Sequence, residues 1–589
     1  MTGPTLPFSQ EINKTKHRLP GEGFKESVVR QAEALKDNYE HFLKLKEIYG
    51  DQRFLNAGRI QASIGSPRET TPYNCFVSGT IPDSMDGIME KLWEAAKTMQ
   101  LGGGIGYDFS TLRPRGALIK SLDSKSSGPI SFMEIFNALC GTISSAGHRR
   151  GAQMGVLRID HPDIEEFIRV KQNKYSLTNF NISVGVTDGF MDCVKHDRSF
   201  DLVFEGRTYK TVNAKALWDE LMRSTWDWAE PGVLFIDKIN RKNNLHYCET
   251  IVATNPCAEQ PLPPYGACLL GSFNLVKYID VNFDLDYDTY RRGGYRTFNY
   301  DKFANDIPHI VRALDNVVDR AIYPLDKQKQ EAQSKRRMGI GVTGVANAIE
   351  ALGYPYGSPE FLTELQKILV TLRDVAYRSS ISLAIEKGPF PKFSKLMLNS
   401  EFCKGLPEDI RQLISEHGIR NSHLLSIAPT GTISLGADNV SSGIEPVFAH
   451  SFERTVRTFD GMIKEVVTDY GYRVHHTKGK TAYEVPAFDH VEVLNLASRY
   501  VDSACSKTCN VGSDVTWEDF KKIYEKAYDG GASGCTTFRK DGKRYGILNE
   551  ETPTEVIPEV VPEVEDEQQL DLFGAACYYD PVTGSKTCD

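Results

Sequence analysis

The chain has 589 residues, of which 40% are hydrophobic and 25% charged, an ordinary composition for a globular protein. Its length allows roughly two to four domains, or one large α/β barrel. A net charge of −9 argues against a general nucleic-acid-binding surface but allows local basic pockets for phosphates. The N-terminus has no apolar signal core and no run of about eighteen apolar residues occurs, so we expect a cytoplasmic protein without a membrane span.

Helical and strand patterns alternate along the first part of the chain. Residues 24–50 have helical periodicity, and residues 84–100 are the clearest amphipathic helix. Residues 101–110 predict a Gly-rich turn that leads into a strand, and residues 129–145 predict a further helix. In the helix over 84–100, the pattern places these residues on one apolar side: Met85, Ile88, Met89, Leu92 and Ala96.

The alternation continues after a basic, Gly-bounded loop at residues 147–155. Residues 156–160 predict a strand, and residues 161–171 predict a helix with Pro162 in its first turn. Strands are predicted again in the runs FNISVGVTD and SFDLVFEG. Strands that alternate with helices in this way predict an α/β fold.

The composition changes near residue 548. Residues 547–576 are acidic and punctuated by prolines, and they lack helical periodicity, which predicts a disordered, flexible linker. The tail after it, residues 577–589, contains Cys577 and Cys588. A flexible linker would let these two thiols reach a site elsewhere on the protein.

The segment NPCAEQPLPPYGACLLGSFNL contains the most distinctive group of reactive residues. It places Cys257 between Asn255 and Glu259, with Cys268 eleven positions after Cys257. Cys257 and Glu259 fit a nucleophile with its base, half of a metal site, or a buried thiol beside a surface acid. No histidine lies within ten residues of Cys257, which disfavours a cysteine–histidine hydrolase.

The twelve cysteines are too few for a disulfide scaffold. In a reducing compartment most should be buried thiols, and any functional ones should be catalytic or redox-active. Cys505 and Cys509 are four positions apart without a second pair nearby, so the sequence predicts no metal site.

The segment APTGTISLG, residues 428–436, predicts a turn of small residues that leads into a helix. Such a turn can present backbone N–H groups and hydroxyls to a phosphate. The GGGIG run at residues 102–106 does not match the G-x-G-x-x-G dinucleotide fingerprint, and no acid follows at the expected distance.

Six segments in the expected order resemble the catalytic subunits of ribonucleotide reductases. NPCAEQ followed by GACLLGSFNL is similar to their active-site loop, and YNCFVSG is similar to the strand with their first redox cysteine. The other matching segments are GGGIGYDFSTLRPRGA, GHRRGAQMGVLRIDHPDIEEFI, APTGTISL and SSGIEPVF. The resemblance covers roughly residues 50–545 and is closest to the class II branch, which uses adenosylcobalamin.

The resemblance implies a ten-stranded α/β barrel with a central finger loop. Cys257 at the tip of this loop would become a thiyl radical and take the 3′ hydrogen of a ribonucleotide. Glu259 would accept the proton of the 3′-hydroxyl as a general base, and Asn255 would hydrogen-bond the ribose. A thiyl radical needs no histidine, because the cysteine loses a hydrogen atom and not a proton.

The resemblance also implies a thiol shuttle. Cys75 and Cys268 would reduce the 2′ carbon and form a disulfide, which must be reduced again in each turnover. Cys577 and Cys588 of the tail would carry electrons to it from thioredoxin, glutaredoxin or another dithiol. Their spacing is wider than that of the family's usual tail pair.

Nucleotide-binding residues follow from the same resemblance. Arg149 and Arg150 would form the specificity loop, and Asp83 and Arg113 would bind a dNTP or ATP effector. The alternative is that Asp83 caps a helix and the arginines are solvated. The residues implied to bind the substrate are Thr430, Gly431, Thr432, Ser434, Asn74 and Gly104.

The implied organisation has four parts. Residues 1–50 would be a short N-terminal helical segment without the ATP-binding cone of many relatives, and residues 51–546 would be the barrel, with the effector site near 80–150. The acidic linker and the redox tail would follow. A homodimer with effector sites at its interface is the expected assembly.

The radical source stays open between two alternatives. Residues 534–546 contain Phe538 but no adjacent tyrosines, which favours adenosylcobalamin over a separate metal-containing subunit. The adjacent Tyr578 and Tyr579 lie in the tail, where they fit spacer residues or part of an unusual radical path. The choice between diphosphate and triphosphate substrates is open as well.

Two other interpretations of the chain compete, and one short segment suggests an additional partner. A glycyl-radical enzyme would share the barrel, but the C-terminus offers no convincing glycyl motif. A nucleotide-binding regulatory protein with inert thiols is a non-enzymatic alternative. Residues 567–574, EQQLDLFG, resemble a short peptide that binds sliding clamps of replication, although we prefer the alternative that they are an apolar anchor in an acidic linker.

Overall fold

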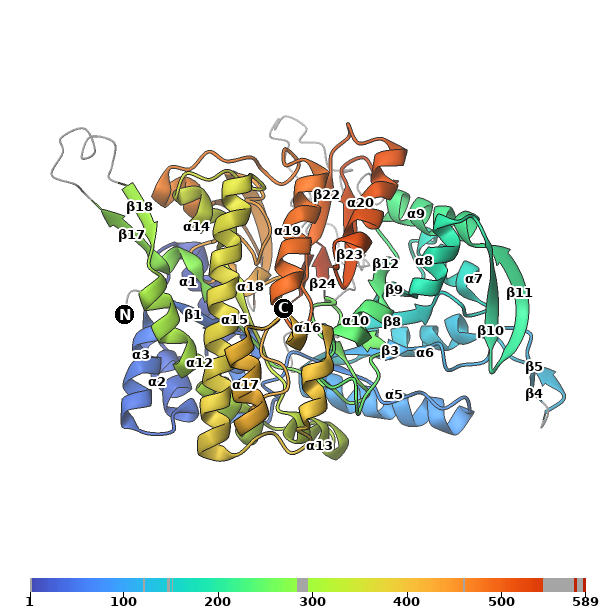
Figure 1. Cartoon of the computed structure of the whole chain (residues 1–589), viewed down its shortest axis with the longest axis horizontal. Helices are drawn as coiled ribbons and strands as arrows, with labels where there is room; N and C mark the ends of the chain where they lie inside the picture. Colours follow the sequence, from blue (N-terminus) through green and yellow to red (C-terminus); the bar gives the residue numbers. More distant parts are fainter. Residues whose placement is uncertain are drawn as a thin grey trace, which may run out of the picture.

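Strands and helices alternate along the chain in the computed structural model (Figure 1), so the predicted α/β class is confirmed. The helix predicted over 129–145 is α6 (Pro129–Thr142), and the Gly-rich turn leads into a strand as expected. The structure describes residues 3–119, 122–145, 149–150, 152–282, 295–458, 461–543, 577–579 and 586–588.

Five parallel strands form the first half of a barrel. Each one pairs with the next along the chain, with one or more helices between them. All seven residues of β9 are buried, as expected for a parallel strand that is covered on both faces. The strands are β2 (Cys75–Val77), β3 (Gly104–Asp108), β8 (Gln153–Arg158), β9 (Phe180–Val186) and β12 (Gly232–Phe235).

A second set of five parallel segments completes the barrel. The set joins the first one where β12 and β23 pair antiparallel. Within the set, each segment pairs with the next one along the chain. The segments are β16 (Leu270–Asn274), β19 (Gly339–Thr343), the extended segment 424–427, the segment 505–511 that ends in β22 (Thr508–Val511), and β23 (Gly534–Arg539). Among the described residues these two sets make the predicted ten-stranded barrel, which is confirmed.

Amphipathic helices cover the outside of the barrel. α12 buries Phe303, Ile307, Ile310 and Leu314, which recur every three or four residues on one side. α12 packs along α15 in the left half of Figure 1, while α9 and α20 lie in the right half of the picture. The long outer helices are α9 (Ala214–Trp228), α12 (Tyr300–Arg320), α15 (Pro359–Lys387), α19 (Ala487–Tyr500) and α20 (Trp517–Asp529).

The helix predicted over residues 24–50 is in fact two helices. α2 (Phe24–Leu35) ends before α3 (Tyr39–Gly50) begins, and the side chain of Asn38 accepts a hydrogen bond from the backbone N–H of His41. Asparagine favours this capping position over a helix interior, so the chain starts a new helix there.

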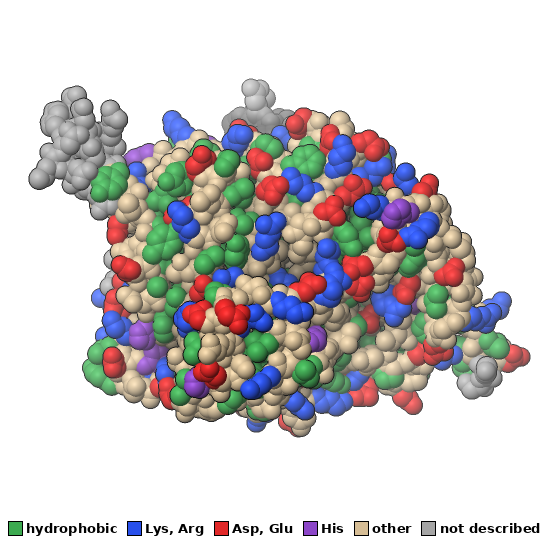
Figure 2. Space-filling view, in the orientation of Figure 1, with side chains coloured by type: hydrophobic (Ala, Val, Ile, Leu, Met, Phe, Trp, Pro, Cys, Tyr) green, Lys and Arg blue, Asp and Glu red, His purple; other side chains and the backbone are tan. Residues whose placement is uncertain are grey.

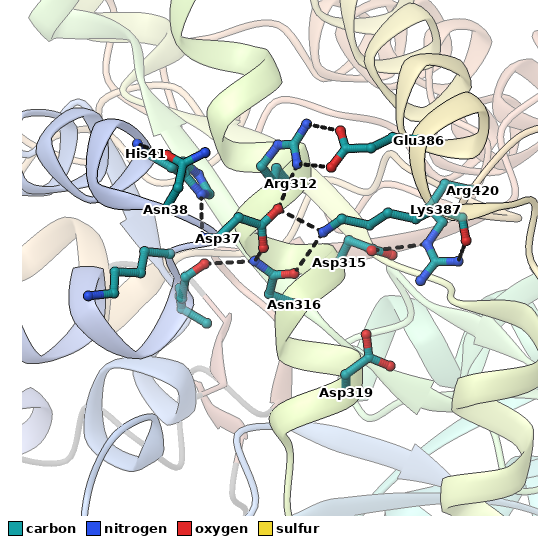
Figure 3. A network of polar contacts seen from close by, with 12 residues as sticks. Asp37, Asn38, His41, Arg312, Asp315, Asn316, Asp319, Glu386, Lys387 and Arg420 are labelled. Atoms are coloured by element: carbon teal, nitrogen blue, oxygen red, sulfur yellow. Dashed lines mark hydrogen bonds and ion pairs between the residues drawn. The ribbon is translucent and has the colours of Figure 1, made fainter.

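A polar network anchors this N-terminal segment to the barrel helices (Figure 3). The carboxylate of Asp37 accepts hydrogen bonds from Lys387 Nζ at 2.7 Å, Arg312 Nη1 at 2.6 Å and Asn316 Nδ2 at 2.7 Å. Burial alone would raise the pKa of Asp37, but the hydrogen bonds from Lys387, Arg312 and Asn316 hold it well below its usual value. Arg312 is further fixed by Glu386. The short N-terminal helices are therefore tied to α12 and α15.

The helix predicted over residues 84–100 is α5 (Met85–Gln100), capped by Ser84, whose side chain accepts from Gly87 N–H. Its predicted apolar side was wrong in part: Ile88 is buried, but Met85 is 58% exposed. The buried side instead includes Lys91 and Glu94, which pair with each other at 3.0 Å and contact Tyr265. Burial of these charges is possible because each has a partner.

The helix predicted over residues 161–171 is shorter than expected. α7 (Ile164–Arg169) begins after Pro162, so this proline is not in its first turn. His161 Nδ1 accepts from the backbone N–H of Asp163 at 3.0 Å, and its Nε2 lies 2.9 Å from the carbonyl oxygen of Leu112. These contacts hold the preceding turn in a non-helical form.

The surface carries both signs of charge. Lys and Arg side chains alternate with Asp and Glu side chains over the face in view (Figure 2). Within the described part of the chain, no helix is both long enough and apolar enough to cross a membrane.

Candidate active site

A β-hairpin carries Cys257 into the barrel. Its strands are β13 (Ala253–Thr254) and β14 (Pro261–Leu262), which pair antiparallel and leave residues 255–260 at the tip. The hairpin passes so close to β3 that a Cβ atom on Gly106 would lie 1.8 Å from the carbonyl oxygen of Thr254. Only glycine allows this approach. The finger loop that the sequence predicts is therefore present.

The tip of the finger is held from several sides. Asn255 Oδ1 accepts from Gln260 N–H at 3.0 Å, which closes the turn within the loop. Asn181 on β9 donates from Nδ2 to the carbonyl oxygen of Pro256 at 3.1 Å. The carbonyl oxygen of Glu259 accepts from Ser426 Oγ at 2.8 Å and from Ala504 N–H at 3.1 Å. The backbone on both sides of Cys257 is thus fixed by the barrel wall.

Two reduced thiols face each other near this tip. Cys75 on β2 and Cys268 on β15 (Ala267–Cys268) are directly opposite in the antiparallel ladder, and both are buried. Asn255 Nδ2 lies 3.9 Å from Cys268 Sγ. Burial, followed by the neighbouring Glu259 carboxylate and Cys75, raises the pKa of Cys268 well above its usual value. The structure therefore brings together Cys75, Cys268, Asn255 and Glu259, as the sequence predicts.

Cys257 itself is only 5% exposed and takes part in a disulfide. Any reaction that begins with loss of a hydrogen atom from Cys257 therefore requires that this disulfide first be reduced.

A cavity lies beside Cys257. It is lined by Cys257 and Ala258 of the finger and by residues of β9, β12, β22 and β23. Polar side chains on this wall include Asn181, Lys507 and Thr536. Cys75 and Cys268 are absent from its described lining. Cys257 thus lines this cavity, while Asn255 of the same finger contacts Cys268 of the thiol pair.

The predicted phosphate turn leads into a short helix, α18 (Gly431–Leu435). Thr430 has a positive φ of 58°, which is unusual for a β-branched residue. Its hydroxyl accepts from Gly443 N–H at 2.8 Å, and the hydroxyl of Ser434 donates to the carbonyl oxygen of Gly431 at 2.9 Å. The Thr430 and Ser434 side chains thus shape the turn, while Thr432 is half-buried at its edge.

Asn74 and Gly104 lie beside the thiol pair. Gly104 is opposite Cys75 in the ladder, and a Cβ atom there would lie 3.2 Å from the Cys75 sulfur. The side-chain oxygen of Asn74 is buried and has no hydrogen-bond partner among the described residues. An orphan acceptor of this kind suits a bound polar ligand.

The two residues predicted to bind the effector pair with each other. Arg113 Nε lies 2.7 Å from Asp83 Oδ2, and the backbone N–H of Arg113 donates to Asp83 Oδ1 at 3.1 Å. Ser84, and not Asp83, caps α5. Arg149 and Arg150 form β7 (Arg149–Arg150), which pairs with β6 (Ser144–Ser145), but their side chains lie outside the described residues.

The tail is described only as backbone in two short strands. β24 (Cys577–Tyr579) and β25 (Lys586–Cys588) pair antiparallel, with Cys577 opposite Cys588. β25 lies beside α18. The side chains of Cys577, Cys588, Tyr578 and Tyr579 lie outside the described part of the chain. The predicted linker over 547–576, which includes the EQQLDLFG segment, also lies outside it.

The sequence did not predict some of the residues that hold the finger in place. Asn181 is one, and its signal was a side-chain amide within a strand that the barrel buries completely. Ser426 and Ala504 gave no such signal, because their contacts to the finger join residues far apart in the chain.

A cysteine-bearing finger inside a ten-stranded α/β barrel, beside a facing pair of thiols, defines the class of fold that the motifs predicted. Residues 73–538 match the family model described as "Ribonucleotide reductase, barrel domain". The chain therefore belongs to the ribonucleotide reductase barrel-domain family, and the predicted resemblance is confirmed.

Named relatives agree with this assignment. The chain is 37% identical to a vitamin B12-dependent ribonucleoside-diphosphate reductase of Thermoplasma acidophilum, over 82% of this chain and 63% of the relative. It is 34% identical to a protein of the same name from Mycobacterium tuberculosis, over 81% and 69%. It is also 27% identical to the ribonucleoside-diphosphate reductase large subunit of Arabidopsis thaliana, over 72% and 58%. The chain thus matches about two thirds of the length of the first two relatives.

Proposed function

We propose that this chain is a ribonucleotide reductase catalytic subunit that converts ribonucleotides to 2′-deoxyribonucleotides by thiyl-radical chemistry. The observation that carries the proposal is the finger tip, where Asn255 and Glu259 flank Cys257 beside the facing thiols of Cys75 and Cys268. The family membership and the names of the relatives support the same activity.

The reaction begins when Cys257, reduced and then stripped of a hydrogen atom, takes the hydrogen atom from the 3′ carbon of the ribose. Glu259 accepts the proton of the 3′-hydroxyl. Asn255 Oδ1 is already bound to Gln260 N–H, which leaves its Nδ2 group to hydrogen-bond the ribose.

The thiol pair supplies the electrons. The 2′-hydroxyl leaves as water, and Cys75 and Cys268 together give two electrons and two protons while a disulfide forms between them. Cys257 then returns its hydrogen atom to the 3′ carbon and becomes a thiyl radical again, while Glu259 returns the proton to the 3′ oxygen. The product carries hydrogen in place of the 2′-hydroxyl, so atoms and electrons balance.

Adenosylcobalamin is the radical source that we propose. When bound, it would supply a carbon-centred radical able to take a hydrogen atom from a thiol. Polar side chains of Asn181, Ser183 and Thr536 line the cavity next to the finger tip. Segment 534–546 lacks the adjacent tyrosines expected for a radical path from a partner subunit. A metal-containing small subunit remains the second candidate source.

Three further features complete the proposal. The substrates are ribonucleoside diphosphates, in line with the names of the Thermoplasma and Mycobacterium relatives, and α18 holds their phosphates with Thr432 at its edge. A nucleoside triphosphate effector binds near Asp83 and Arg113. A thioredoxin-type or other dithiol restores the Cys75–Cys268 pair through the tail cysteines.

A homodimer is supported by an exposed apolar stripe on α5. Met85, Met89 and Trp93 lie four residues apart on one side and are 58%, 40% and 58% exposed. Large apolar side chains grouped on one helix face favour burial against a second surface.

The direct test is reduction of CDP by the purified chain with dithiothreitol, with and without adenosylcobalamin. We expect dCDP only when the cofactor is present. Folded chain that binds CDP but forms no dCDP under either condition would contradict the cobalamin assignment and direct the search to a partner subunit. Turnover that survives in Cys257→Ser would contradict the whole proposal.

A further inference from the structure

A fully buried lysine lies in the wall of the Cys257 cavity. Lys507 has a side chain with no solvent exposure, and its Nζ donates to Glu445 Oε2 at 2.7 Å. The same ammonium contacts His490 Nδ1 at 3.0 Å and the carbonyl oxygen of Thr508 at 3.3 Å. All three donors of the ammonium are therefore used within the protein. A buried charge is tolerated only when it is paired in this way.

Glu445 holds the backbone of the same wall. Its second oxygen, Oε1, accepts from the N–H of Thr508 at 2.7 Å. One carboxylate thus fixes two consecutive residues, Lys507 by its side chain and Thr508 by its backbone. Both residues line the cavity together with Cys257. The position of the Glu445 carboxylate therefore determines the shape of this cavity wall.

Glu445 is itself attached to the phosphate turn. It lies in the loop segment 441–445, in which Gly443 N–H donates to Thr430 Oγ1 at 2.8 Å. Ser442 Oγ lies 3.0 Å from Ser434 Oγ, and Glu445 N–H donates to the Ser442 carbonyl oxygen at 2.8 Å. One end of the loop is therefore bound to α18 and the other end to the cavity wall.

The wall also reaches the finger. Ala504 N–H donates to the carbonyl oxygen of Glu259 at 3.1 Å, and Ser506 N–H donates to that of Ile427 at 2.8 Å. Residues 504–508 thus contact the finger at one end and Glu445 at the other. Hydrogen bonds at both ends of segments 441–445 and 504–508, joined by the backbone of these segments, thus connect the phosphate turn to Glu259, two positions after Cys257.

We propose that Glu445 and Lys507 are positioning residues that couple occupancy of the phosphate turn to the geometry of the Cys257 cavity. The inference rests on the proposed function, since it takes the turn at α18 as the site of the substrate phosphates. The pair does not touch the reacting atoms. The pair keeps segment 504–508 in a fixed position relative to the phosphate turn. The radical step therefore proceeds only when a nucleotide is bound.

The substitution Glu445→Gln tests this coupling with little change of shape. It removes the charge that Lys507 needs but leaves the phosphate turn intact. We expect the Kd for CDP to stay within about 3-fold, while kcat falls about 100-fold, as for other small displacements of reacting groups. Lys507→Met is the second variant. The double variant should lose no more than the worse single one, because both changes break one interaction.

A control separates coupling from general loss of stability. Asp315→Asn breaks another buried ion pair, to Arg336 at 2.8 Å, and Asp315 is not among the cavity-lining residues. We expect this variant to lower the melting temperature as much as Glu445→Gln does, but to keep kcat within about 3-fold.

Hydrogen–deuterium exchange provides a readout that does not depend on turnover. In the wild-type chain, CDP should slow exchange of the backbone amides in segment 504–508, and Glu445→Gln should abolish that protection while CDP still binds. Wild-type chain that binds CDP without protecting this segment would overturn the coupling. Wild-type chain that shows the protection but makes no dCDP would leave the coupling intact and count against the proposed function alone.

Discussion

The finger tip and the outer face of α5 differ in which side chains they bury. At the tip, the backbone around Cys257 is held by Asn181, Ser426 and Ala504 of the same chain, and nearly every side chain is buried. On α5, Met85 and Trp93 are more than half exposed, while the charged Lys91 and Glu94 are buried. One chain therefore encloses the finger tip with its own residues but leaves large apolar side chains of α5 uncovered. The first should tolerate almost no change, and the second should respond to assembly.

The largest effect should come from the finger thiol. Cys257→Ser keeps the size of the side chain but holds its hydrogen atom too tightly for radical transfer, so kcat should fall about 10⁴-fold or more while the fold is kept. Turnover of CDP, with circular dichroism as a check on folding, measures this. The matched control is Cys248→Ser, since Cys248 is an exposed free thiol outside the site, and it should keep full activity.

Crowding the base of the finger should damage both stability and activity. In Gly106→Ala the new Cβ atom would lie 1.8 Å from the Thr254 carbonyl oxygen. Relieving this clash requires a shift of the backbone, which costs folding free energy. We expect a loss of about 3 kcal/mol in the free energy of unfolding in urea. Gly189→Ala has nothing within 4 Å of its new Cβ atom and should be neutral or slightly stabilising. Equal stability of the two variants would show that the finger does not press on β3.

A charge on the exposed stripe should break the assembly and leave the reaction centre intact. Trp93→Glu puts a carboxylate on the face where α5 is expected to meet a second copy, so the chain should sediment as a monomer at micromolar concentration. Leu396→Glu alters a side chain that is also 52% exposed but lies elsewhere, and it should leave the dimer unchanged. A wild-type chain that sediments as a monomer, or a Trp93→Glu variant that stays dimeric, would rule out this interface.

The smallest effect concerns the network in Figure 3. The pKa of Asp37 is lowered in the folded protein, so its stabilising effect is present above its unfolded pKa, near 4, and disappears as the pH falls towards the folded value. Asp37→Asn should cost about 1 kcal/mol at pH 7, after allowance for solvent screening. Urea unfolding from pH 7 down to pH 3 should show the difference between variant and wild type shrinking.

Asp409 provides the control for that series. It is an exposed carboxylate that pairs with Arg378 on the surface, so Asp409→Asn should give no measurable loss of stability at any pH. A difference for Asp37→Asn that grows as the pH falls would contradict the role assigned to its ion pairs.

The sequence predicted the barrel, the finger and the thiol pair because its local motifs resemble those of the ribonucleotide reductase family. Cys75, Asn255, Cys257, Glu259 and Cys268 all stand in short segments whose residue types and spacing are distinctive. The break between α2 and α3 also had a local signal, the helix-capping residue Asn38. Helical periodicity alone does not take such a capping residue into account.

What the sequence did not predict depends on contacts between distant residues. The buried face of α5 was misplaced because Lys91 and Glu94 find their partner in Tyr265, more than 170 residues away. Glu445 and Lys507 are 62 residues apart, and no periodic pattern links them. Such pairs become visible only when the chain is folded, because burial of a charge is decided by its partner and not by its own residue type.

The most direct measurement is a single turnover without external reductant. Chain that has been reduced and then freed of dithiol is mixed with CDP and adenosylcobalamin, and the dCDP formed is compared with the disulfides found by peptide mapping. We expect about one dCDP for each active chain, with a new disulfide between Cys75 and Cys268, and a further turnover only where the tail thiols contribute. Formation of dCDP with Cys75 and Cys268 still reduced would contradict the role of the thiol pair.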